Sequence, residues 1–180
     1  MADNCWKTVR LGDVCNKIGS GATPRGGSRV YRDNGTALIR SQNIYNEGFH
    51  YEGLVRIGNA HSEQLSNAVV QSRDLLLNIT GDSVARCCRA PADLGPARVN
   101  QHVAIVRPDP NQIDPGFLRF FMVNPKMQRH MLAFAGTGGT RNALTKGLIE
   151  GFSITVPSLP EQRAIADILG SLDDKIELNR

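Results

Sequence analysis

The C-terminal segment, residues 157–180, carries an apolar repeat that only a helix places on one face. Its members are spaced by four, three and four residues: Ile165, Leu169, Leu172 and Ile176. With Ile165 and Leu172 at d positions and the other two at a positions, this narrow stripe is typical of a coiled-coil seam. We therefore predict one long coiled-coil-type helix. Packing of the helix onto its own domain remains an alternative, because the repeat covers only two heptads.

The two ends of this helix differ in their signals. Pro160 is suited to the first helical position, where its missing N–H is not needed. No glycine, asparagine or proline follows Arg180 to cap the last turn. We expect a helix that stops before its natural end.

Residues 1–156 read as a separate, strand-rich domain, which makes the expected fold class α+β. Apolar and alternating runs predict strands within the segments 8–18, 36–44, 74–81, 84–91, 100–108 and 152–157. Asp114 and Pro115 predict the start of a helix, and Pro125 divides it from a second one. A short helical turn is expected around Leu148. The chain thus divides into 1–156 and 157–180.

Sulfur and aromatic side chains are assigned to the core. Met127, Met131, Leu132 and Phe134 share helical spacing, so we expect them to be buried. The adjacent pair Cys87–Cys88 lies in a predicted strand, where the two side chains point to opposite faces. No cysteine or histidine spacing resembles a metal site or a disulfide framework, so free thiols and no metal are expected.

Charge is distributed unevenly along the chain. Residues 1–156 contain 18 Lys and Arg against 12 Asp and Glu, and 14 of the 18 are arginine. The segment from Pro157 onward contains three basic and five acidic residues. Arginine grips phosphate or the guanine edge with a planar fork, so this head indicates a polyanion partner. A slightly basic solvated surface explains the same numbers equally well.

Two glycine-rich segments, 19–29 and 135–147, are predicted loops that combine Gly, Ser or Thr with basic residues. The first lacks the third glycine of a dinucleotide fingerprint, and the second lacks the Gly-Lys-Ser/Thr order of a P-loop. Their amides, hydroxyls and guanidinium groups would suit DNA phosphates and base edges. Ordinary surface loops are the alternative.

Several function classes find no support in the residues. There is no G-x-S-x-G elbow, no Cys and His pairing suggestive of catalysis, and no N-P-P-Y-type tetrad of an adenine methyltransferase. We expect the chain alone to be non-catalytic. No signal peptide or apolar run of about 20 residues is present, so a cytoplasmic protein without a membrane partner is expected.

Six ordered blocks of the sequence resemble the specificity subunits of type I restriction–modification systems: WKTVRLGDVCNKIGSGATP, LIRSQNI, LLLNITGDSVAR, VNQHVAIVRP, GTGGTRNALTKGLIEGFSITVP and SITVPSLPEQRAIADILGSLDDKIELNR. The last resembles the junction between a target-recognition domain and its spacer helix. The resemblance extends along the whole chain.

The resemblance implies double-stranded DNA as the ligand. In that family two target-recognition domains each read one half of a split sequence, separated by an antiparallel coiled coil. Methyltransferase subunits dock on this scaffold and use S-adenosylmethionine, and a restriction subunit with a motor requires ATP and Mg²⁺; no cofactor is expected in this chain itself. Because one domain and one incomplete helix are present, the chain would be a truncated subunit or a half-length one that pairs with itself or a second half.

Carried onto this sequence, the resemblance makes the two glycine-rich loops DNA-facing and adds residues beside predicted strand ends. The candidate DNA-binding residues are Ser20, Thr23, Arg25, Arg29, Arg40, Asn43, Thr80, Arg86, Arg98, Gln101, His102, Thr137, Thr140, Arg141, Asn142 and Lys146. Two other functions stay open: a coiled-coil adaptor with an incidental basic head, and a phosphate-ligand enzyme built on the two loops.

Overall fold

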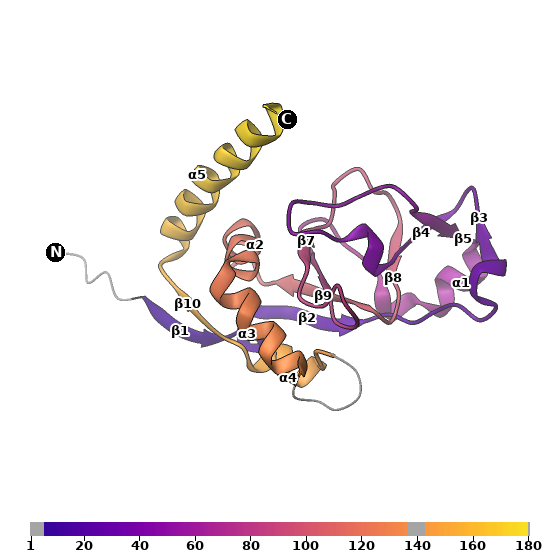
Figure 1. Cartoon of the computed structure of the whole chain (residues 1–180), viewed down its shortest axis with the longest axis horizontal. Helices are drawn as coiled ribbons and strands as arrows, with labels where there is room; N and C mark the ends of the chain where they lie inside the picture. Colours follow the sequence, from indigo (N-terminus) through magenta and orange to yellow (C-terminus); the bar gives the residue numbers. More distant parts are fainter. Residues whose placement is uncertain (1–5, 137–142, 180) are drawn as a thin grey trace.

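A computed structural model describes residues 6–136 and 143–179. It confirms an α+β fold, in which strands dominate the first half and helices the second (Figure 1). The elements, including the 3₁₀ turns η1–η4, are β1 (Lys7–Arg10), η1 (Leu11–Val14), β2 (Cys15–Ser20), η2 (Gly27–Val30), β3 (Tyr31–Arg32), β4 (Thr36–Ile39), η3 (Ser41–Asn43), β5 (Val55–Ile57), α1 (Asn59–Gln64), η4 (Ser66–Ala68), β6 (Leu75–Asn78), β7 (Cys87–Arg89), β8 (Ala97–Val99), β9 (Val103–Pro108), α2 (Pro115–Val123), α3 (Pro125–Gly136), α4 (Lys146–Gly151), β10 (Ser153–Val156) and α5 (Leu159–Leu178).

A central antiparallel sheet, in the order β2-β9-β6-β7, is covered on both faces. Successive residues of β6 enter different cores: Leu75 and Leu77 point into one, and Leu76 points into the other. Cys87 and Cys88 divide in the same way, which confirms the prediction that they face opposite sides of a sheet. Two-sided burial explains why β6 has a continuous apolar run instead of an alternating one.

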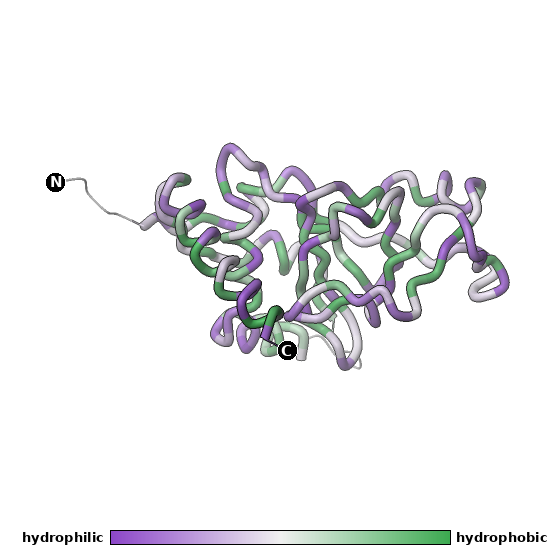
Figure 2. The backbone as a smooth tube through the Cα atoms, turned by 90° about the horizontal axis from the view of Figure 1, so that it is seen from above, coloured by the Kyte–Doolittle hydropathy of each residue, from purple (hydrophilic) through white to green (hydrophobic). Residues whose placement is uncertain are grey.

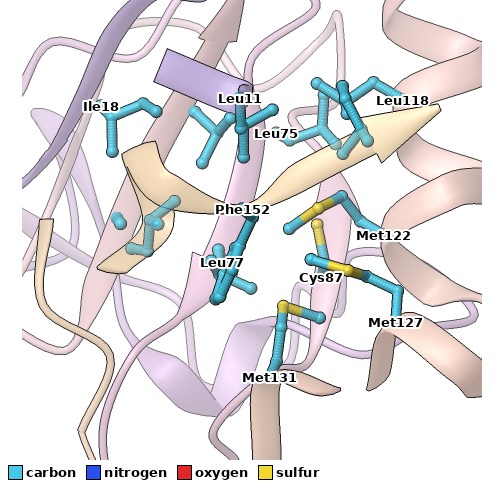
Figure 3. Close-up of a cluster of buried hydrophobic side chains, with 14 of the residues drawn as sticks. Leu11, Ile18, Leu75, Leu77, Cys87, Leu118, Met122, Met127, Met131 and Phe152 are labelled. Carbon is cyan, nitrogen blue, oxygen red and sulfur yellow. The ribbon is translucent and has the colours of Figure 1, made fainter. Parts of the chain in front are cut away.

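Each core has its own cover. The first lies between the central sheet and helices α2, α3 and α4, where the side chains of Met122, Met127 and Cys87 point toward one another (Figure 3). The second lies between the central sheet and a sheet in the order β3-β5-β4-β8. A third, two-stranded sheet pairs β1 with β10. Hydrophobic stretches run through the interior, whereas hydrophilic stretches follow much of the outline (Figure 2).

The helical part follows the sequence prediction in most respects. The Asp114 side chain caps α2 by accepting from the Gly116 and Phe117 amides at 2.8 and 2.9 Å. Met127 and Met131 are buried as expected. Leu132 and Phe134 are not: they are 48% and 38% exposed. Phe134 packs against the ring of the buried Phe152 at the edge of the first core, with centroids 6.1 Å apart. The prediction that Leu132 and Phe134 are buried was therefore wrong.

Short elements account for the other differences. The predicted strand 36–44 ends at Ile39, because the next residues turn into η3 around the buried Asn43. The prediction for 100–108 begins too early, since β9 starts at Val103 after a turn. The strands β3, β5 and β8 and helix α1 were not predicted at all.

Helix α5 begins at Leu159, one residue earlier than predicted, and its first half docks on the globular part. Gln162 is 1% exposed; its Nε2 donates to the Pro157 carbonyl at 2.9 Å and its Oε1 accepts from the Asp114 amide at 2.8 Å. Arg119 of α2 pairs with Asp173 further along. The segment 157–180 is therefore anchored to the preceding residues rather than joined to them by a loose linker.

The predicted seam of α5 is used in two ways. Ile165 and Ala166 pack against the first core, and Leu169 is partly buried. Leu172 and Ile176 are 50% and 54% exposed. Beyond Asp173, which pairs with Arg119, the helix extends past the globular part (yellow in Figure 1). Ile165 thus packs within its own chain, whereas the later positions remain accessible.

A buried ion pair ties the central sheet to the loop before β6. Asp74 is fully buried; its two carboxylate oxygens accept from Arg107 Nε and Nη2 at 2.7 and 2.8 Å. The Gln71 amide also donates to Asp74 at 2.7 Å. Removing one partner of a buried pair leaves the other charge uncompensated.

Asp74→Ala is expected to lower the free energy of unfolding by about 3 kcal/mol, because it leaves Arg107 unpaired. Urea unfolding followed by circular dichroism measures the change. Asp33→Ala is the control, since Asp33 is exposed in a turn and should change stability by less than about 0.5 kcal/mol. Equal effects of the two substitutions would contradict a structural role for the ion pair.

Candidate nucleic-acid interface

The carboxyl ends of four strands meet at one edge of the molecule. β9 pairs antiparallel with both β2 and β6, so Ser20 and Asn78 end beside the start of β9, opposite Ala104 and Val103. β4 runs parallel to β8, and the Asn100 amide after β8 donates to the Ile39 carbonyl at 3.1 Å. The loops that follow these ends, residues 20–29, 40–45, 79–86 and 100–102, form what we call the strand-end face.

A chain of side-chain hydrogen bonds links three of these loops. The Thr23 hydroxyl donates to Gln101 Oε1. Gln101 Nε2 donates to His102 Nε2 at 2.9 Å, and His102 Nδ1 donates to Thr80 Oγ1 at 2.6 Å. The three loops are therefore held in a fixed mutual arrangement.

A cleft of about 470 Å³, lined mainly by residues with polar side chains, opens on the strand-end face; it is called the polar cleft below. It joins the η3 turn, the β6–β7 loop and the turn before β9. Below it, Asn78 is fully buried; its Nδ2 donates to the Ser41 carbonyl at 2.9 Å and to Ser83 Oγ at 3.1 Å. The lining residues are Ser41, Gln42, Tyr45, Thr80, Gly81, Asp82, Ser83, Arg86 and His102.

Arg86 forms one end of a stack at the rim of the cleft. Its guanidinium carbon lies 4.7 Å from the centroid of the Tyr45 ring, and Tyr45 in turn stacks on His50 with centroids 4.0 Å apart. A guanidinium over an aromatic face is stabilised by the ring quadrupole and keeps its edge free to donate. The stack thus fixes a cation beside a polar cleft, which is a favourable arrangement for an anionic ligand.

The structure brings many of the predicted DNA-binding residues together. Thr80, Arg86 and His102 line one cleft, and Thr23 and Gln101 join them through hydrogen bonds. Ser20, Arg25 and Arg29 are exposed at the end of β2 and in the loop that follows it. The face therefore combines hydroxyl, amide and guanidinium groups.

Three predicted residues turn inward instead. Asn43 is fully buried, and its Nδ2 donates to the His50 and Glu52 carbonyls at 2.9 and 3.2 Å. Arg98 donates to the Ser62 and Ala97 carbonyls at 3.2 and 3.0 Å. Arg40 donates to the Gly53 carbonyl at 2.6 Å and lies over the Tyr31 ring. These contacts hold loops, so a role for Asn43 at the surface is not supported.

The second glycine-rich loop is described only in part. Thr137, Thr140, Arg141 and Asn142 lie outside the described residues. Ala143 forms a β-bridge with Thr80, which places the end of this loop beside the strand-end face. Lys146, at the start of α4, is exposed, and its Nζ lies 3.5 Å from Glu150 Oε1.

Sequence reasoning missed six cleft residues: Ser41, Gln42, Tyr45, Gly81, Asp82 and Ser83. The available signal was a residue with a polar group directly after a predicted strand. It describes Tyr45, after the predicted strand 36–44, and Asp82, after 74–81, but not the other four. The cleft depends on three loops that are far apart in the sequence, and their meeting follows from strand order alone.

The described residues provide neither a reactive thiol at Cys15 or Cys88 nor a cluster of metal ligands. Burial raises the pKa of Cys15 and Cys88 to about 12, so both thiols stay protonated and poorly nucleophilic near neutral pH. No group of three His, Cys, Asp or Glu residues suited to a metal ion occurs in residues 6–136 and 143–179. Within the same ranges, no helix has the length and apolar character needed to cross a membrane.

Comparison with protein families gives the class of the chain. Residues 4–180 match the family described as Type I restriction modification DNA specificity domain. The chain belongs to this family, in agreement with the resemblance seen in its sequence blocks.

Individual relatives are distant but cover the chain almost completely. It is 25% identical to a putative type I restriction enzyme MjaX specificity subunit of Methanocaldococcus jannaschii, over 97% of this chain and 38% of that protein. It is 23% identical to the type I restriction enzyme HindI specificity subunit of Haemophilus influenzae, over 97% of this chain and 36% of that protein. The chain thus spans less than two-fifths of the length of these relatives.

Solved structures share the fold. The HsdS subunit from Thermoanaerobacter tengcongensis superposes with a TM-score of 0.68 at 19% identity, over 99% of this chain and 39% of that one. A type I specificity subunit from M. genitalium gives a TM-score of 0.65 at 14% identity, over 98% of this chain and 41% of that one.

Proposed function

We propose that this chain recognises one half of a two-part DNA sequence as the specificity component of a type I restriction–modification complex, and that it is non-catalytic by itself. The observation that supports this most directly is the strand-end face, where exposed arginines lie beside hydrogen-bonding side chains. The chain's membership of a family of DNA specificity domains supports the same proposal. Phosphate contacts from the arginines would position the duplex, and the polar groups of the cleft would read base edges.

Two competing functions gain less support. A phosphate-ligand enzyme would need a loop that cradles phosphate with its backbone, yet the loop after β2 carries its basic residues on exposed side chains. A coiled-coil adaptor would need no ordered polar face, whereas a hydrogen-bond chain links three loops here.

The chain is expected to bind duplex DNA with a steep salt dependence, because neutralising phosphates releases counterions. Fluorescence anisotropy at increasing salt, alone and with a type I methyltransferase subunit, measures the slope. Replacing both Arg25 and Arg29 by alanine should reduce the slope of log Kd against log salt by about 1 to 2.

Replacing Arg10 by alanine is the charge control for this experiment. Arg10 is exposed at the end of β1, at the other end of the domain from the strand-end face, and its loss should change the slope by less than the double substitution does. No duplex binding at low salt, even with the methyltransferase subunit present, would refute the proposed function.

Helix α5 is proposed to join this domain to a second recognition half and to the methyltransferase subunit. Its 20 residues span about 30 Å, close to one turn of B-DNA. The docked first half, through Gln162 and Ile165, would fix the direction in which the helix leaves the domain. The exposed second half, with Ile168, Leu172 and Ile176, leaves an apolar stripe for another helix.

Replacing both Leu172 and Ile176 by aspartate should abolish self-association or methyltransferase docking, because charged groups would enter the helix interface. Unfolding stability should change by less than about 0.5 kcal/mol, since both side chains are about half exposed. Light scattering and urea unfolding measure the two effects.

Ile165→Asp provides the comparison on the same helix. Ile165 packs against the first core, so its replacement should lower the free energy of unfolding by about 2 kcal/mol. If the Leu172 and Ile176 double variant keeps the molar mass of the wild-type protein in light scattering and still binds the methyltransferase subunit, the role proposed for α5 is contradicted.

A further inference from the structure

Asp82 is an acidic residue on a face whose other charged groups are mostly basic. It is exposed in the β6–β7 loop and lines the polar cleft together with Gln42, Arg86 and His102. Within the described part of the chain, no lysine or arginine forms an ion pair with it. Its carboxylate is therefore not engaged in a salt bridge within these residues, and its oxygens can act as acceptors at the cleft.

The loop that carries Asp82 is held in a fixed and strained conformation. Gly81 and Ala85 both have positive φ angles, 74° and 73°, and alanine rarely adopts this region. Ala85 is fully buried, and its amide donates to the Asn78 carbonyl at 2.9 Å. The Val84 amide donates to the Gly81 carbonyl at 3.1 Å. Surrounding contacts thus maintain a costly turn, as is common at functional sites.

The floor of the cleft fixes the same loop from the other side. Asn78 donates through Nδ2 both to Ser83 Oγ, next to Asp82, and to the Ser41 carbonyl of the opposite rim. Asn78 is fully buried, whereas its two partners line the cleft, so the bridge ties the cleft wall to the interior. Asp82 is therefore presented from a preorganised position rather than from a freely moving loop.

The chemistry of DNA limits what such a carboxylate can bind. Phosphates repel it, and base edges offer it few donors. In the major groove those donors are the exocyclic amines, N4 of cytosine and N6 of adenine. Arg86, stacked on Tyr45 at the cleft rim, supplies a cation that a neighbouring phosphate can use.

We propose that Asp82 is a specificity-determining residue that accepts a hydrogen bond from the exocyclic amine of one cytosine or adenine in the target duplex. This assignment rests on the proposed DNA-reading function. It goes beyond that function by naming the residue, the atom it contacts and the chemical group that is read.

The test is selection from a duplex library of random sequence by the full chain with a type I methyltransferase subunit. The wild-type protein should select a defined motif, in which one base pair is read through its exocyclic amine. Asp82→Asn should weaken the preference at that position alone by roughly fivefold, because an amide offers a donor as well as an acceptor. The remaining positions of the motif should be unchanged.

Asp13→Asn is the matched control. Asp13 is exposed and lies before β2, at the opposite end of that strand from the strand-end face. The Asp13→Asn variant should therefore select the same motif as the wild-type protein. If Asp82→Asn selects the same motif as the wild type, the proposal is overturned. This includes the case in which the variant binds all duplexes more tightly by the same factor, because a charge that repels phosphates has been removed. Failure of the wild type to select any duplex would instead refute the proposed function.

A second measurement does not depend on the folding of a variant. In the selected duplex, the cytosine or adenine at that position is replaced by the analogue that lacks the exocyclic amine. The wild-type protein should lose roughly fivefold in affinity for the duplex that contains the analogue. Equal affinity of the wild type for both duplexes overturns the proposal.

Discussion

Burial of the central sheet on both faces is the constraint from which the rest of the structure follows. Strands β6, β7 and β9 send alternate side chains into two separate cores, so neither face is left to meet a ligand. The ends of the strands are the parts that stay in contact with water. Because β2, β4, β6 and β8 end at the same edge, the loops with hydrogen-bonding and basic side chains gather there.

Buried polar groups then give that edge a defined shape. Asn43 and Asn78 donate through Nδ2 to backbone and side-chain acceptors in neighbouring loops, and such partners offset the cost of burying the amide N–H groups. The hydrogen bonds from Thr23 through Gln101 and His102 to Thr80 extend the same principle to the surface. A face built in this way presents its side chains with little loss of conformational entropy on binding.

Local signals in the sequence predicted the features that depend on neighbouring residues. The Asp114–Pro115 helix start, the opposite faces of Cys87 and Cys88 and the α+β class all follow from spacing and capping. Strands of two or three residues, such as β3 and β8, carry too little periodicity to be recognised. The signal for α5 was right about the helix but could not tell which of its apolar residues are used by the domain itself.

The candidate site was less predictable because it depends on tertiary contacts. Asn43 and Arg98 have the residue types of DNA contacts, yet their hydrogen bonds point into the molecule. Asp82 and Tyr45 each follow a predicted strand, but only strand order brings them to one cleft. Family resemblance supplied the class of ligand, and the structure supplied the geometry.

Amide hydrogen exchange of the full chain, with and without duplex DNA, tests the central claim that the strand-end face is the DNA-binding surface. The account predicts slower exchange on DNA binding in residues 20–29, 40–45, 79–86 and 100–102, and little change in α3 and α5. Protection confined to the helices, with the four loops unaffected by bound DNA, would contradict it.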